Sequence, residues 1–148
     1  MFDLNAVTSG VTGANDTKYA LVPAGEYMAQ IEKYEGRQMP TERGIATVVD
    51  ITWTILDEEV KKITNLEKPT VRQSVFLELT EDQKLDTGAQ KNIKLGRLRE
   101  ALALNDPSKE FSFDTLLGQI GTITIAHTPD KKDPEIVYAN VSKVGSAN

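Results

Sequence analysis

The chain of 148 residues contains no cysteine and a single histidine, His127. Without cysteine it has no disulfides, thiolate metal sites or cysteine nucleophiles, and one histidine cannot build a histidine metal cluster. No apolar run approaches the ~20 residues that a membrane-spanning helix needs. The first residues, MFDLNAVTSG, lack a basic start followed by an apolar core. We therefore expect no secretory signal, no contact with a membrane and a cytoplasmic location.

Motifs typical of enzymes are also missing. The chain has no G-x-x-x-x-G-K-[ST] phosphate loop. Asp57, Glu58 and Glu59 are adjacent, but a charged turn after a strand explains them better than acid–base catalysis. Asp130 and Asp133 flank two lysines without the spacing of a metal-binding loop. We expect neither catalysis nor a bound cofactor or metal.

The composition is that of a soluble globular protein. Hydrophobic residues make up 39% of the chain and charged residues 26%, which argues against wholesale disorder. The length suits one ordinary domain. The net charge of −5 argues at first sight against nucleic acid as the partner, because binders of nucleic acid usually carry a basic surface.

Three regions follow one another along the chain. Residues 1–20 are rich in small polar residues without periodicity, and we expect a flexible N-terminal arm. Residues 21–144 are expected to form the folded domain, and residues 145–148 a short C-terminal tail.

Alternation of apolar and polar residues predicts five strands in the domain. In the second of them Trp53 shares its face with Val49 and Ile51, so we expect Trp53 in the core. A polar loop is expected at residues 36–44 and a turn-rich hairpin loop at residues 128–134. The predicted strands span residues 26–34, 45–55, 70–79, 119–127 and 135–144.

A helix is predicted between the third and fourth strands. Residues 89–104 place Leu95, Leu98 and Leu102 on one helical stripe, with capping chemistry at residues 86–87. Residues 111–117 are compatible with a short second helix. The fold class is therefore all-β with one main helix. The order β-β-β-α-β-β predicts a five-stranded, partly open barrel with the topology of the oligonucleotide/oligosaccharide-binding fold, or OB-fold.

Five segments carry a family resemblance: residues 22–31 (VPAGEYMAQI), 48–53 (VVDITW), 77–79 (LEL), 91–102 and 116–121 (LLGQIG). Together they resemble a bacteriophage-encoded family of single-stranded DNA-binding proteins, over nearly the whole predicted domain. The resemblance implies an OB-fold and sequence-tolerant DNA binding in DNA replication or recombination, in the cytoplasm of the host cell. It also implies replication or recombination proteins as partners, and a possible homo-oligomer. Many such proteins end in an acidic tail, whereas this sequence ends VGSAN, so we expect no recruitment of partners through a tail.

Binding a single strand requires cations along a groove and exposed rings on which bases stack. Three groups of residues meet this description: a pair on the third strand, a pair at the end of the first strand, and a group in the last hairpin. The candidate nucleic-acid-binding residues are Phe76 with Arg72, Tyr34 with Arg37, and Tyr138 with Lys131, Lys132 and Lys143.

Alternative interpretations stay open for these residues. Phe76 lies on the polar face with Arg72, but it could equally cover a secondary apolar patch beneath a loop. The basic residues of the predicted helix, among them Lys94 and Arg97, are expected on a solvated face. For the whole protein, the alternative function is a structural or adaptor β-barrel, in a virion or bound to a protein partner, and the negative charge fits it at least as well.

Overall fold

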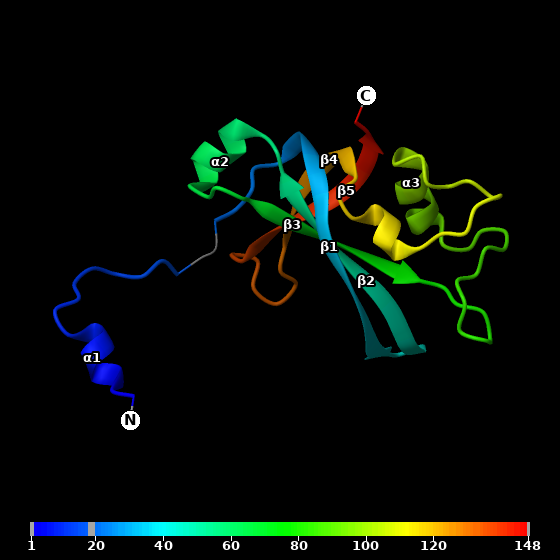
Figure 1. Ribbon diagram of the computed structural model, residues 1–148. Helices are drawn as coiled ribbons and strands as arrows, with labels where there is room; N and C mark the ends of the chain where they lie inside the picture. Colours follow the sequence, from blue (N-terminus) through cyan, green and yellow to red (C-terminus); the bar gives the residue numbers. More distant parts are fainter. Residues whose placement is uncertain (1, 18–19, 148) are drawn as a thin grey trace.

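Residues 2–17 and 20–147 are described by a computed structural model, and most of its regular structure is one antiparallel sheet (Figure 1). The strands lie in the order β3-β2-β1-β4-β5. The five predicted strands are confirmed, with shifted ends. The strands are β1 (Gly25–Thr41), β2 (Gly44–Ile55), β3 (Thr70–Leu77), β4 (Ile120–Pro129) and β5 (Val137–Ser146).

The sheet is open. Its edge strands, β3 and β5, come within 8 Å of each other between Cα atoms, yet neither is a ladder partner of the other. Paired strands lie about 4.8 Å apart, so the two edges flank a seam and do not close a barrel. The structure thus shows an open five-stranded sheet where the sequence predicts a partly open barrel.

The core lies on the inner face of the curved sheet and beneath α3 (Ile93–Ala101). Trp53 is completely buried there, as predicted, and its indole Nε1 donates a hydrogen bond of 2.9 Å to Oε1 of Gln73. Leu95 and Leu98 of α3 are buried against the same cluster. Each such side chain contributes roughly 1.5–3 kcal/mol through burial of apolar surface.

The predicted start of the main helix is wrong. The helix begins at Ile93 after Asn92, which has a left-handed backbone (φ 52°) and does not cap the helix with its side chain. Instead the Asn92 amide bridges the carbonyl oxygens of Glu78 and Asp86, at 2.8 and 2.9 Å. Because these bonds fix the chain ahead of the helix, residues 86–92 form turns and not a first helical turn.

The predicted polar loop at residues 36–44 is strand. β1 continues to Thr41 and turns tightly into β2 at Gly44, where φ is 115°. Pairing of β2 with β3 stops at Thr47–Leu77, so the hairpin beyond that point projects as a two-stranded ribbon (Figure 1). The ribbon is exposed on both faces, and therefore its sequence lacks the alternation that identifies a half-buried strand.

A short helix, α2 (Glu58–Thr64), replaces part of the predicted charged connection between the second and third strands. Asp57 caps it, accepting hydrogen bonds from the backbone N–H groups of Glu59 and Val60 at 2.9 and 3.1 Å. Val60 and Thr64 are one turn apart and buried. A 3₁₀ turn, η1 (Phe113–Leu116), forms where the second short helix was expected.

The N-terminal residues 2–17 are exposed throughout and contain one short helix, α1 (Leu4–Thr8). Figure 1 shows α1 well away from the sheet. Positions 1, 18 and 19 of the predicted arm and position 148 of the predicted tail lie outside the described residues. The tail boundary is wrong, because β5 continues to Ser146.

Candidate nucleic-acid interface

A β-bulge in β1 decides which residues reach the outer face of the sheet. Ile31 pairs with Trp53 and Lys33 pairs with Thr52, so Glu32 is an extra residue in the ladder. One extra residue reverses the faces of everything that follows it. Beyond the bulge Tyr34 therefore faces the core, while the odd-numbered residues Lys33, Glu35 and Arg37 share the outer face.

Tyr34 is consequently a packing residue, and the predicted pair of Tyr34 with Arg37 is not formed. Its ring lies 5.9 Å from that of Phe113, between centroids. Its hydroxyl donates to the carboxylate of Asp114, which raises the pKa of the Tyr34 phenol. The two residues lie on opposite faces of β1.

Arg37 is held by a carboxylate that the sequence did not single out. Its Nε donates to Oδ2 of Asp50 at 2.6 Å, and the hydroxyl of Ser74 donates to Oδ1 of the same residue at 2.6 Å. The Arg37 guanidinium, followed by the Ser74 hydroxyl, holds the pKa of the nearly buried Asp50 below its ordinary value. Arg37 therefore adds little net positive charge to the outer face.

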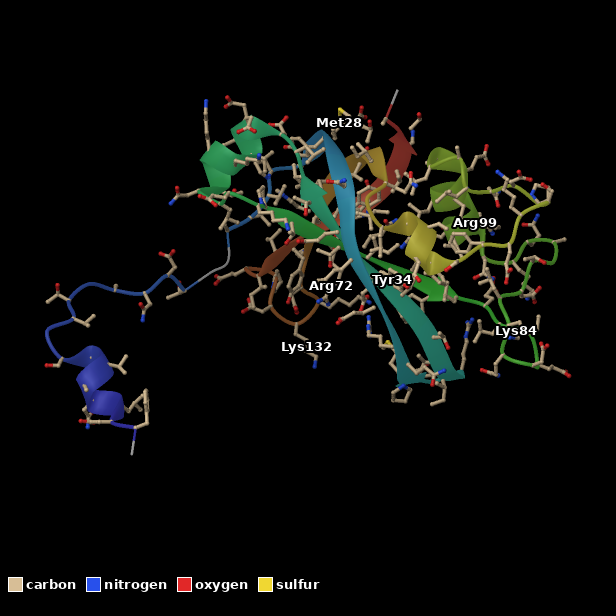
Figure 2. The ribbon with its side chains drawn as sticks, in the orientation of Figure 1. Met28, Tyr34, Arg72, Lys84, Arg99 and Lys132 are labelled. Atoms are coloured by element: carbon tan, nitrogen blue, oxygen red, sulfur yellow. The ribbon has the colours of Figure 1, made fainter. Side chains whose placement is uncertain are left out.

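Phe76 lies on the outer face as predicted, and 56% of it is exposed. It is the ladder partner of Val48, which is fully buried although it points to the same side. Phe76 is thus exposed to solvent beside an apolar neighbour. This position is compatible with stacking of a base and also with coverage of a secondary apolar patch. Arg72, labelled in Figure 2, lies on β3 four residues before Phe76 and shares its face.

A groove of about 420 Å³ follows the seam between the two edge strands, and we call it the seam groove. β3 contributes Arg72 and Ser74, β5 contributes Tyr138 and Asn140, and α3 contributes Lys94. The ammonium of Lys94 donates to the carbonyl oxygen of Ser74 at 2.8 Å and stays exposed. The sheet order thus brings together Arg72 and Tyr138, which the sequence places in separate groups.

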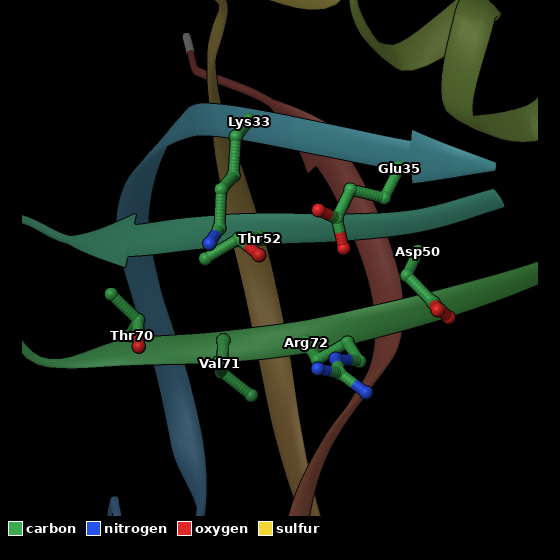
Figure 3. A pocket seen from close by; sticks show the side chains of 7 residues that line it. All are labelled: Lys33, Glu35, Asp50, Thr52, Thr70, Val71 and Arg72. Atoms are coloured by element: carbon green, nitrogen blue, oxygen red, sulfur yellow. The ribbon is translucent and has the colours of Figure 1, made fainter.

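A second hollow adjoins the seam groove at Arg72. It lies on the outer face of β1, β2 and β3 (Figure 3), where Lys33 and Arg72 extend from strands on either side of Thr52. Glu35 and Asp50 lie beside them. A path from Lys33 through Arg72 to Lys94 therefore carries three exposed cations, interrupted by one exposed carboxylate.

The basic residues of the last hairpin do not gather around Tyr138. Asp130 folds the loop by accepting hydrogen bonds from the backbone N–H of Lys132 and from the Tyr138 hydroxyl, at 2.8 and 2.9 Å. These bonds lower the pKa of Asp130, and the same carboxylate raises the pKa of Tyr138. Figure 2 shows Lys132 pointing away from the sheet, and Lys131 is exposed in the same loop.

Lys143 lies farther along β5, in a different groove beside α3. It is five residues beyond Tyr138, a distance of roughly 16 Å along a strand. The predicted group of Tyr138 with Lys143 is therefore not formed. The predicted binding residues also did not include Lys33 and Lys94, which line the site. Helical spacing alone predicts a solvated face for Lys94, whereas its position in the seam groove opposite β5 indicates a different role.

Two further observations concern the described residues alone. None of their helices is long and apolar enough to cross a membrane. Over residues 2–17 and 20–147 no three histidine, aspartate or glutamate side chains are grouped so that they could hold a metal ion.

No family model matches the sequence, and a search of curated proteins returns no match.

Proposed function

We propose that the protein binds single-stranded DNA with little sequence preference, as a bacteriophage protein of DNA replication or recombination in the host cytoplasm. The observation that carries the proposal is the seam groove. It combines an exposed ring, Tyr138, with the cations Arg72 and Lys94, and adjoins at Arg72 the outer-face hollow that contains Lys33. Phe76 is exposed on the same face of β3 as Arg72. Rings beside cations are what sequence-tolerant binding of a single strand requires.

The proposed roles differ among the residues. Bases stack on the rings of Phe76 and Tyr138, residues that are 56% and 49% exposed. Phosphates bind Arg72 and Lys94, and the strand extends towards the loop that carries Lys131 and Lys132. Tyr34, Arg37 and Lys143 are left out, because the first is packed, the second is paired with Asp50 and the third lies in another groove.

We also propose that the sheet is an OB-fold whose edge strands stand apart. The strand order β3-β2-β1-β4-β5 and the position of α3 between β3 and β4 support this assignment. In OB-folds the face of the second and third strands and the adjoining loops bind oligonucleotides. The outer-face hollow and Phe76 lie on the corresponding face of this sheet.

The test is a titration of fluorescently labelled oligo(dT) and of a matched duplex with the purified protein at two salt concentrations. We expect the single strand to bind more tightly than the duplex. Phe76→Ala and Tyr138→Ala are each expected to weaken binding by about fivefold or more, since a stacked base is worth ~1–3 kcal/mol. Tyr138→Phe, which keeps the ring, should bind like the parent protein.

Lys62→Ala provides the control for Arg72→Ala and Lys94→Ala, because Lys62 is exposed on α2 and pairs only with Glu59 in the described structure. It should leave binding unchanged while the other two weaken it. Equal affinity for both nucleic acids, or none at low salt, would contradict the proposal. The absence of binding to either nucleic acid would favour the alternative of a structural or adaptor module.

A further inference from the structure

A second groove, of about 990 Å³, runs between α3 and the end of β5; we call it the α3–β5 groove. Ile93 and Ala101 of α3 and Val144 of β5 give it apolar walls, and Ile93 is 46% exposed. Arg97 of α3 and Lys143 of β5 add positive charge. The groove therefore offers an apolar surface with cations beside it, which suits an amphipathic segment carrying negative charge.

The N-terminal helix α1 has the complementary character. Leu4 and Val7 of α1 follow the helical spacing i, i+3, and Val11 lies three residues beyond the end of the helix at Thr8. The three side chains are 70%, 58% and 67% exposed. Isolated helices shorter than about 12–15 residues are marginal in water, and most helices are stabilised by burying an apolar face. A five-residue helix with its apolar residues in solvent thus lacks the contact that would stabilise it.

Charge adds to the match in shape and polarity. Residues 1–20 contain the carboxylates of Asp3 and Asp16 and one lysine, Lys18. The α3–β5 groove contains Lys94, Arg97 and Lys143 against one carboxylate, Glu100. Opposite charges on two surfaces favour their correct pairing more than they add to affinity.

The position of the arm points to another molecule and not to its own groove. The chain joins the sheet at the buried Val22, whose carbonyl oxygen lies 2.7 Å from Nε2 of His127 on β4. His127 pairs with Ala139 near the start of β5, whereas the α3–β5 groove lies at residues 142–146. Figure 1 shows α1 and α3 on opposite sides of the sheet. The eleven residues from Val11 to Val22 span at most about 40 Å, enough to reach a neighbour.

We propose that α1 of one molecule docks in the α3–β5 groove of a second copy, with Leu4 and Val7 against Ile93, Ala101 and Val144. Because donor and acceptor surfaces differ, the contact is head-to-tail and adds molecules in a row or ring. This inference goes beyond the proposed function and does not depend on it.

The first test measures mass against concentration by light scattering after size-exclusion chromatography, without nucleic acid. The parent protein is expected to rise above its monomer mass of 16.3 kDa as concentration increases. Val7→Asp should stay monomeric. Ala6→Asp adds the same charge on the opposite side of α1 and should associate like the parent protein. A parent protein that is monomeric up to millimolar concentration would overturn the proposal.

The second test uses the absence of cysteine, which makes introduced thiols unique. Chains carrying Val7→Cys are mixed with chains carrying Ile93→Cys under mild oxidation, and the disulfide-linked heterodimer is quantified. We expect it to form at least fivefold faster than with Ala6→Cys chains. A double variant that closes on itself faster than it links to a second copy would show docking in the same molecule and would overturn the proposal.

Discussion

Asp50 shows how a single side chain can set the character of a binding face. It lies among the outward-facing residues of β2, and only 8% of it is exposed. By pairing with Arg37 it removes from the face a cation that would otherwise be free for phosphate. The side chain of Arg72, the next cation on this face, is exposed and adds to the lowering of the pKa of Asp50 through its charge.

Asp50→Asn is expected to destabilise the protein by about 1 kcal/mol at pH 7, because Arg37 and Ser74 then donate to a neutral acceptor in place of a charged one. The loss stays small because solvent partly screens the exposed Arg37. The folded state lowers the pKa of Asp50, so its contribution is complete above the unfolded value of about 3.9 and is lost as the pH falls through the folded pKa. Urea unfolding at pH 7 and near pH 2.5 measures this difference, which should shrink at the lower pH.

Glu35→Gln is the matched control, since Glu35 is the ladder partner of Asp50 and is exposed. Its free energy of unfolding should stay within about 0.5 kcal/mol of the parent value. A difference between Asp50→Asn and the parent that is as large near pH 2.5 as at pH 7 would refute the assignment of Asp50 as a stabilising charge.

At the scale of the element, the sequence predicted all five strands, because apolar and polar residues alternate along at least part of each strand. It failed where burial does not alternate. The β1–β2 ribbon is exposed on both faces, and α2 is only seven residues long, too short for a helical period to emerge. The retrospective signal for α2 was Asp57 as a cap, followed by Val60 and Thr64 one turn apart.

Alternation within single strands also determines which residues of the candidate site could be predicted. Phe76 and Arg72 were placed correctly, because two residues of one strand with the same parity share a face. Tyr34 was misplaced because no local pattern identifies the bulge at Glu32. The approach of Tyr138 to Arg72 depends on the order of strands distant in sequence, which alternation within each strand does not determine.

Asp57→Ala is expected to destabilise the protein by about 1 kcal/mol, the usual cost of removing an N-cap. Asp57→Asn keeps an acceptor for the backbone N–H groups of Glu59 and Val60 and should lose much less. Thermal unfolding followed by circular dichroism compares the two variants. Equal losses would mean that the charge of Asp57, and not its role as a cap, stabilises α2.

At the scale of the whole molecule, the net charge of −5 opposes the approach of DNA, and the proposed contacts must act locally. The cations of the proposed path are few, and Lys94 is shared between the seam groove and the α3–β5 groove. The docking site proposed for α1 of a second copy therefore lies beside the proposed DNA path, and molecules joined in this way present a longer path than one molecule does.

Affinity for oligo(dT) is expected to fall steeply with salt. Each phosphate neutralised contributes a slope of about −0.7 in log K against log salt, so three to five contacts give roughly −2 to −3.5. Titrations at four salt concentrations measure this slope, and Arg72→Ala should reduce its magnitude by about 0.7. A slope near zero would mean that phosphates contribute nothing to binding.

One hydrogen bond in the core has a practical consequence. Trp53 is the only tryptophan of the chain, and its indole donates a hydrogen bond to Gln73. Gln73 lines both the seam groove and the α3–β5 groove. The indole is shielded from bulk water, and its Nε1 is hydrogen-bonded to Gln73. Tryptophan fluorescence of the unmodified protein therefore comes from one side chain, which is hydrogen-bonded to a residue that both grooves share.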